Sequence, residues 1–239
     1  MERVWKLVSW GMGLIVLIAL IIYPLNESKT AWNSWNLPLS GKTIVIDPGH
    51  GGPDGGAVGS DETLEKDIAL NVSKKLRDFL QQAGAIVYLT RETDTDLANE
   101  DTKGLRYRKA EDIRKRLEFI NSKNADFFVS IHLNALSSTR WRGAQTFYYS
   151  KYDESKKLAK MIQSEIIRNL ENTKRDALAI NGVYILKHAE IPGALVEIGF
   201  LSNNQERELL KQGEYQEKMA ASVYEGILRY ITDNTEEAE

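Results

Sequence analysis

The segment TIVIDPGHGG, residues 43–52, begins with a run of β-branched and apolar residues and continues directly into Asp-Pro-Gly. Such a run is typical of a buried strand, and the Pro and Gly residues force a turn at its end. The following segment, residues 64–83, has apolar residues at spacings of three and four, which predicts an amphipathic helix that ends at Gly84. A strand that leads through a glycine-rich loop into a helix is typical of α/β folds.

Strands and helices continue to alternate along the chain. Short apolar segments predict strands at 86–89, 127–131, 145–149, 183–186 and 194–198. Periodic segments predict helices at 108–121, 158–170, 203–210 and 215–231. This alternation predicts an α/β fold, a single domain whose mostly parallel or mixed central sheet is flanked by helices. In such sheets, ligands bind beyond the carboxyl ends of the strands.

Composition excludes several classes of protein. Of the 239 residues, 42% are hydrophobic and 27% are charged, which is a globular composition and not that of a disordered chain. The formal net charge of −3 argues against a nucleic-acid partner, because phosphate contacts need a basic surface. The absence of Cys excludes thiolate catalysis and Cys-ligated zinc, so any metal ligands must be carboxylates or come from the three His.

The amino-terminal segment 1–25 is predicted to be a transmembrane anchor or a signal segment. Residues 7–25 carry no charge and follow Arg3 and Lys6, which favours a cytoplasmic amino end. At about 1.5 Å per residue they would span roughly 28 Å, close to the thickness of the hydrocarbon layer. An uncleaved anchor is favoured over a signal peptide because no small-residue cleavage site follows Ile22. We expect a linker at 26–40, one catalytic domain at 41–231 and an acidic tail at 232–239.

Polar side chains stand where three buried strands end. His50 lies in the glycine-rich loop, His132 follows the strand 127–131, and Glu197 stands among apolar residues of the strand 194–198. Two His and a carboxylate at adjacent strand ends have the ligand types of a catalytic zinc site, which keeps an open position for water. Glu65 opens the first helix and is the best candidate for the third ligand, and this leaves Glu197 free as a base.

Structural interpretations of the same residues remain open. A His at a strand end is often only hydrogen-bonded, and Glu65 could complement the positive end of its helix. The loop could also be a phosphate cradle, but it lacks the Gly-Lys-Ser/Thr ending of a P-loop. Glu197 is harder to explain, because burying an unpaired carboxylate is costly. The third His, His188, is interpreted as a surface residue.

Taken in order, five motifs resemble the zinc-dependent N-acetylmuramoyl-L-alanine amidases, the type 3 amidase family. The motifs are IDPGHGG at 46–52, Glu65 with Asn71, Arg116 with Ile120-Asn121, SIHLNA at 130–135 and VEIGFLSN at 196–203. The resemblance covers residues 42 to about 230. It implies that His50, Glu65 and His132 bind one Zn²⁺ and that Glu197 is the catalytic carboxylate. Asn134, two residues after a ligand, is a candidate for substrate binding.

The resemblance also implies a substrate and a place of action. The substrate is the amide between N-acetylmuramic acid and L-alanine in peptidoglycan, hydrolysed outside the cytoplasm by a membrane-anchored or secreted enzyme. Members that act in spore germination are the most similar, which implies a step toward muramic δ-lactam in the spore cortex, at the forespore envelope. The segment between His132 and Glu197 shows no room for the inserted helix that blocks the site in some members. Regulation by an accessory protein or by expression is therefore favoured.

Two other functions remain as alternatives. One is a zinc peptidase that cleaves within the stem peptide. The H-x-x-E pair of a zinc carboxypeptidase is absent, however, because Pro53 stands three residues after His50. The other is an anchored, non-catalytic module that binds the cell wall.

Overall fold

The chain separates into two compact units, Met1–Leu37 and Pro38–Glu239. The structure is a computed structural model, and it describes residues 5, 10–18 and 37–236. Residues 5 and 10–18 of the predicted anchor 1–25 are helical, whereas its other residues, 1–4, 6–9 and 19–25, lie outside the described residues, as does most of the predicted linker. None of the helices in the described part of the chain is long and apolar enough to cross a membrane.

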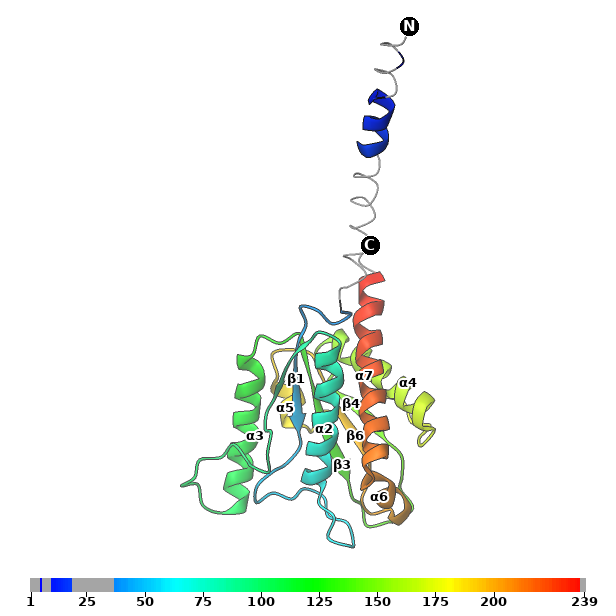
Figure 1. Cartoon of the computed structure of the whole chain (residues 1–239). Coiled ribbons are helices and arrows are strands. Elements are labelled where there is room, and N and C mark those ends of the chain that lie inside the picture. Colours follow the sequence, from blue (N-terminus) through cyan, green and yellow to red (C-terminus); the bar gives the residue numbers. More distant parts are fainter. Residues whose placement is uncertain (1–4, 6–9, 19–36, 237–239) are drawn as a thin grey trace. The chain divides into compact units, whose positions relative to one another are not determined.

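A mixed sheet forms the centre of the second unit (Figure 1). Its strand order is β2-β1-β3-β6-β4-β5, and neighbouring strands are parallel except for β4 and β6. The strands are β1 (Thr43–Pro48), β2 (Ile86–Leu89), β3 (Phe127–Asn134), β4 (Gln145–Tyr148), β5 (Leu178–Ala179) and β6 (Gly193–Phe200). The predicted α/β fold with a mixed sheet is confirmed.

Helices cover both faces of the sheet. The apolar cluster on one face joins the sheet to α2 (Glu65–Gln82), α4 (Asp153–Leu170) and α7 (Gly213–Glu236). A smaller cluster on the other face joins it to α3 (Leu105–Ser122) and α5 (Tyr184–His188), and α6 (Asn204–Leu210) follows β6. The cores form because the helices present apolar stripes, and each fully buried Leu or Ile contributes roughly 1.5–3 kcal/mol. The longest element between His132 and Glu197 is α4, and it packs against the same face of the sheet as α7.

The structure departs from the predicted elements at specific places. The strand predicted at 183–186 is wrong, because this segment begins the short helix α5. A run of four apolar residues does not distinguish a strand from a helical turn, and here consecutive Ile185 and Leu186 are both buried in one cluster. The strand β5 was not predicted. In addition, α7 continues to Glu236, so residues 232–236 of the predicted acidic tail are helical.

Parallel pairing places the ends of three strands at one edge of the sheet. Pro48 at the end of β1 is paired with Ile131 of β3, and His132 is paired with Glu197 of β6. The helix α2 begins at the same edge, because the chain returns to it through the glycine-rich loop after β1. This topology brings the polar residues of separate segments together.

Candidate functional site

The structure brings together the three side chains that were predicted as metal ligands. Glu65 Oε2 lies 3.2 Å from His50 Nε2, and Glu65 Oε1 lies 2.9 Å from His132 Nδ1. One donor atom from each of the three residues lies within 4.8 Å of the others. The Glu65 side chain is buried, whereas each imidazole is partly exposed. Two imidazole nitrogens and a carboxylate oxygen are the donor types that zinc takes in catalytic sites.

Glycine at two positions allows this close arrangement. A Cβ atom on Gly49 would lie 2.4 Å from His132 Cε1, and one on Gly56 would lie 2.5 Å from Glu65 Oε2. Gly56 also has a φ of 71°, in the left-handed region that side chains disfavour. The glycine-rich loop can therefore fold directly against the three side chains.

Two arginines hold the backbone that carries His50. The backbone of His50 is itself left-handed, with a φ of 60°, which is uncommon for a residue with a side chain. Arg116 donates to the carbonyl oxygens of Pro48, at 2.6 Å, and of His50, and Arg91 donates to that of Gly49 at 2.8 Å. These bonds satisfy carbonyl groups that the turn removes from the sheet, and they stabilise the turn.

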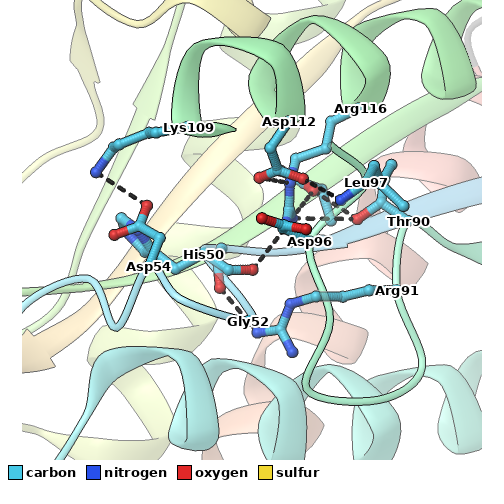
Figure 2. A network of polar contacts seen from close by, with 12 residues as sticks. His50, Gly52, Asp54, Thr90, Arg91, Asp96, Leu97, Lys109, Asp112 and Arg116 are labelled. Carbon is cyan, nitrogen blue, oxygen red and sulfur yellow. Dashed lines mark hydrogen bonds and ion pairs between the residues drawn. The ribbon is translucent and has the colours of Figure 1, made fainter. Parts of the chain in front are cut away.

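A buried polar network anchors Arg116 beneath this turn (Figure 2). Asp47 Oδ1 lies 2.9 Å from Arg116 Nη1 and accepts a hydrogen bond from Thr90, while Asp47 Oδ2 accepts one from Ser130. Burial would raise the pKa of Asp47, but the Arg116 charge and the two hydroxyl donors lower it to about 2. Asp112 accepts from Arg116 Nε at 2.7 Å. No role was predicted for Asp47 from the sequence, although its place at a strand end was a usable signal.

Asp54 orients the ring of His50. Its Oδ2 lies 2.8 Å from His50 Nδ1 and 3.0 Å from Lys109 Nζ, as Figure 2 shows. A carboxylate at Nδ1 fixes the ring orientation and leaves Nε2 facing Glu65. Burial would lower the pKa of His50, but hydrogen bonds and charge from Asp54 and Glu65 outweigh it and raise the pKa to about 9. This negative potential would equally favour a bound cation. No role was predicted for Asp54 either, although it lies four residues after His50.

Glu197 lies beside this group, on the neighbouring strand β6. It is paired across the sheet with His132, and its Oε2 is buried with no hydrogen-bond partner among the described residues. Burial raises its pKa to about 7, with a smaller contribution from the charge of Glu65, and nearby His132 and His50 oppose the shift. A carboxylate whose pKa lies near neutrality can accept a proton and return it.

A cavity of about 230 Å³ adjoins Glu197. Asn134, the predicted substrate-binding residue, lines it together with Trp141, Arg175 and Phe200. None of these last three residues was singled out for a role from the sequence. His188 lies elsewhere, exposed on α5, where its ring contacts Tyr184.

Comparisons with known proteins agree with this architecture. Residues 44–229 match the family described as N-acetylmuramoyl-L-alanine amidase. The chain is 52% identical over 239 residues to the germination-specific N-acetylmuramoyl-L-alanine amidase of Bacillus subtilis, with 100% of both chains covered. It is 34% identical over 209 residues to N-acetylmuramoyl-L-alanine amidase LytC of the same organism, covering 87% of this chain and 39% of LytC.

A solved structure gives the same result. The CwlD amidase from Clostridioides difficile, solved in complex with the GerS lipoprotein, superposes with a TM-score of 0.79 and 44% sequence identity. The match covers 80% of this chain and 99% of that one. From its sequence and its fold, the chain therefore belongs to the N-acetylmuramoyl-L-alanine amidase family.

Proposed function

We propose that this enzyme hydrolyses the amide between N-acetylmuramic acid and L-alanine in spore-cortex peptidoglycan, with one Zn²⁺ held by His50, Glu65 and His132. The observation that carries the proposal is the position of Glu197, a half-buried residue whose Oε2 is buried and has no hydrogen-bond partner among the described residues, beside a His-Glu-His group. A purely structural cluster would pair that oxygen, because leaving it unpaired costs about 1–3 kcal/mol.

The residues present fit a zinc ion. The His-Glu-His group supplies three ligands of the types and number found in catalytic zinc sites. Asp54 orients one of these ligands, His50, through its Nδ1 atom. Bound there, Zn²⁺ would supply Lewis-acid polarisation of the scissile carbonyl and activation of water. The backbone N–H of Leu133 donates to Glu65 at 2.8 Å and keeps that carboxylate oriented.

Glu197 acts as the general base and then as the general acid. As water attacks the lactyl carbonyl, the Glu197 carboxylate accepts a proton from it. The protonated carboxyl then delivers that proton to the alanine nitrogen, because an amine leaves poorly unless it is protonated. The products are a free lactyl carboxylate on the sugar and a peptide with an amino-terminal alanine. We also propose that Asn134, in the adjoining cavity, contacts the substrate.

Mass spectrometry of digested muropeptides tests this function. The expected products are intact stem peptides with a free amino-terminal alanine, together with glycan that lacks peptide, and a chelator should abolish both. An endopeptidase would instead leave shortened peptides attached to muramic acid. A wall-binding module would sediment with sacculi and release no product. Either of these two results would overturn the proposal.

The place of action and the partner extend this proposal. The uncharged segment 7–25 supports a membrane anchor that holds the domain 41–231 outside the cytoplasm, at the forespore envelope, where it would act toward muramic δ-lactam. The relative from Clostridioides difficile forms a complex with a lipoprotein, which supports an accessory lipoprotein for this chain as well. Co-purification of the full chain from sporulating cells, with membrane fractionation, tests both.

A further inference from the structure

The cavity beside Glu197 contains a positive charge that the proposed chemistry does not use. Arg175 comes from the segment between α4 and β5, and it lines the cavity together with Trp141 and Phe200. The volume of about 230 Å³ lies below the roughly 300–1,000 Å³ typical of drug-sized ligands. A volume of this size fits one or two residues of a peptide.

The guanidinium of Arg175 is held in a fixed orientation. Its Nη1 donates to the carbonyl oxygen of Gly143 at 2.6 Å, and its central carbon lies 5.1 Å from the centre of the Phe200 ring. A backbone acceptor and an aromatic face restrict the planar group from two sides. The remaining N–H groups of the guanidinium are thereby held in place to donate hydrogen bonds to a planar, negatively charged acceptor such as a carboxylate.

This half-buried charge forms no ion pair with the part of the chain that the structure describes. Within the described ranges, no carboxylate forms an ion pair with Arg175, whereas the buried Arg207 pairs with Asp61 at 2.9 Å. The charge of Glu206 acts on Arg175, but its two oxygens accept the N–H groups of Gly143 and Phe200. Partly burying a cation without an ion pair is costly, so the position favours an anionic ligand.

The cavity is partly open to solvent, and half of its lining residues are apolar. Trp141 and Leu136, which both line it, are 49% and 46% exposed. Exposed apolar side chains beside an unpaired guanidinium are complementary to a short peptide that carries both aliphatic groups and a carboxylate. Because Glu197 forms part of the same cavity, that peptide would lie next to the bond that is cleaved.

We propose that Arg175, set against Phe200, binds a carboxylate of the leaving peptide within one or two residues of the scissile alanine. This specificity rests on the proposed amidase function. Hydrogen bonds to charged groups contribute about 1.5–3 kcal/mol, which corresponds to roughly 10- to 150-fold in affinity. The enzyme would therefore prefer muropeptides whose stem is acidic at this position over those in which the same carboxylate is amidated.

Steady-state kinetics of the zinc-loaded full chain test the proposal with two muramoyl-peptides that differ only in this group, a carboxylate or its carboxamide. We expect Arg175→Gln to raise KM at least tenfold for the acidic substrate, with little change in kcat and little effect on the amidated one. Arg175→Lys should retain part of the preference for the acidic substrate that Arg175→Gln loses. Lysine keeps the positive charge but lacks the paired N–H donors of the guanidinium. Lys174→Gln, an equal change of charge at an exposed neighbour, should leave both KM values unchanged.

The two-substrate design separates recognition from structural damage. Loss of the Gly143 hydrogen bond alone would impair both substrates equally, and that result for Arg175→Gln would overturn the proposal. Equal KM values for the two substrates with the unmodified enzyme would overturn it as well. If the unmodified enzyme cleaves neither substrate, the proposed amidase function fails instead, which is a distinguishable outcome.

Discussion

His132 and Glu197 occupy paired positions on the neighbouring parallel strands β3 and β6. One residue belongs to the candidate metal group, and the other carries the buried oxygen without a partner. Their separation is therefore set by the spacing of strands in the sheet, which is rigid, and not by a loop. A base fixed in this way relative to a metal ligand needs little reorganisation during catalysis.

Replacing Glu197 should separate metal binding from catalysis. Glu197→Gln keeps the shape of the side chain but removes the proton acceptor, so we expect activity to fall by about 10²–10⁴-fold while the zinc content stays at one per chain. His132→Ala should lose both. Metal analysis and muropeptide release are the measurements. Normal digestion of cell wall by the Gln variant would contradict the role assigned to Glu197.

Asp54 should control the affinity for zinc without being a ligand. Removing a carboxylate that orients a ligating imidazole typically lowers metal affinity by about 10–100-fold. We expect that loss for Asp54→Ala, because His50 Nδ1 would lose its partner at 2.8 Å. Competition with a chelator measures the affinity. Asp101→Ala, at an exposed position, is the matched control, and equal affinities for the two variants would refute the role of Asp54.

Gly49 should be intolerant of even a methyl group. Alanine at this position would place its Cβ 2.4 Å from the ring of His132, so the ring or the loop must move. We expect Gly49→Ala to lose zinc and to destabilise the fold by about 1–3 kcal/mol. Gly182→Ala is the control, because a Cβ there meets nothing within 4 Å. Zinc content and denaturant unfolding distinguish the two variants. Full zinc occupancy in Gly49→Ala would show that the loop is not closely fitted.

The Asp47–Arg116 pair should make stability depend on pH in the acid range. The pKa of Asp47 is about 2 in the folded protein, against an ordinary value of 3.8. Because the folded value is the lower one, the stabilisation is fully present above about pH 4 and is lost as the pH falls toward 2. The difference corresponds to about 2 kcal/mol. Urea unfolding between pH 2 and 5 measures it.

The carboxylate itself can be tested in the same experiment. Asp47→Asn should reduce the dependence of the free energy of unfolding on pH below pH 4, because the titrating carboxyl is gone. It should also lower the free energy of unfolding at neutral pH, because Arg116 loses its charged partner at 2.9 Å. Asp101→Asn should change neither. If wild type and Asp47→Asn lose stability in parallel below pH 4, another group dominates acid unfolding. Direct titration of the Asp47 carboxyl signal gives the same answer should the variant not fold.

The sequence by itself determined most of the order of strands and helices and the main candidate residues. Apolar periodicity is a local property, and His50, His132 and Glu197 stand out because each breaks an apolar or glycine-rich segment at or near a strand end. The same local reasoning failed at residues 183–186, where tertiary packing against the sheet selects a helical turn. Short apolar segments carry too little periodicity to decide between the two.

Only the tertiary structure decided which distant side chains meet. Asp54 contacts Lys109 across 55 residues. Arg175, in the segment before β5, faces Phe200 of β6 only because β4 pairs with β6 and β5 pairs with β4. Those contacts depend on strand order and on the faces that the helices leave uncovered. The free energy that stabilises these contacts comes from burying the whole apolar core. They therefore cannot be predicted from any single segment of the sequence.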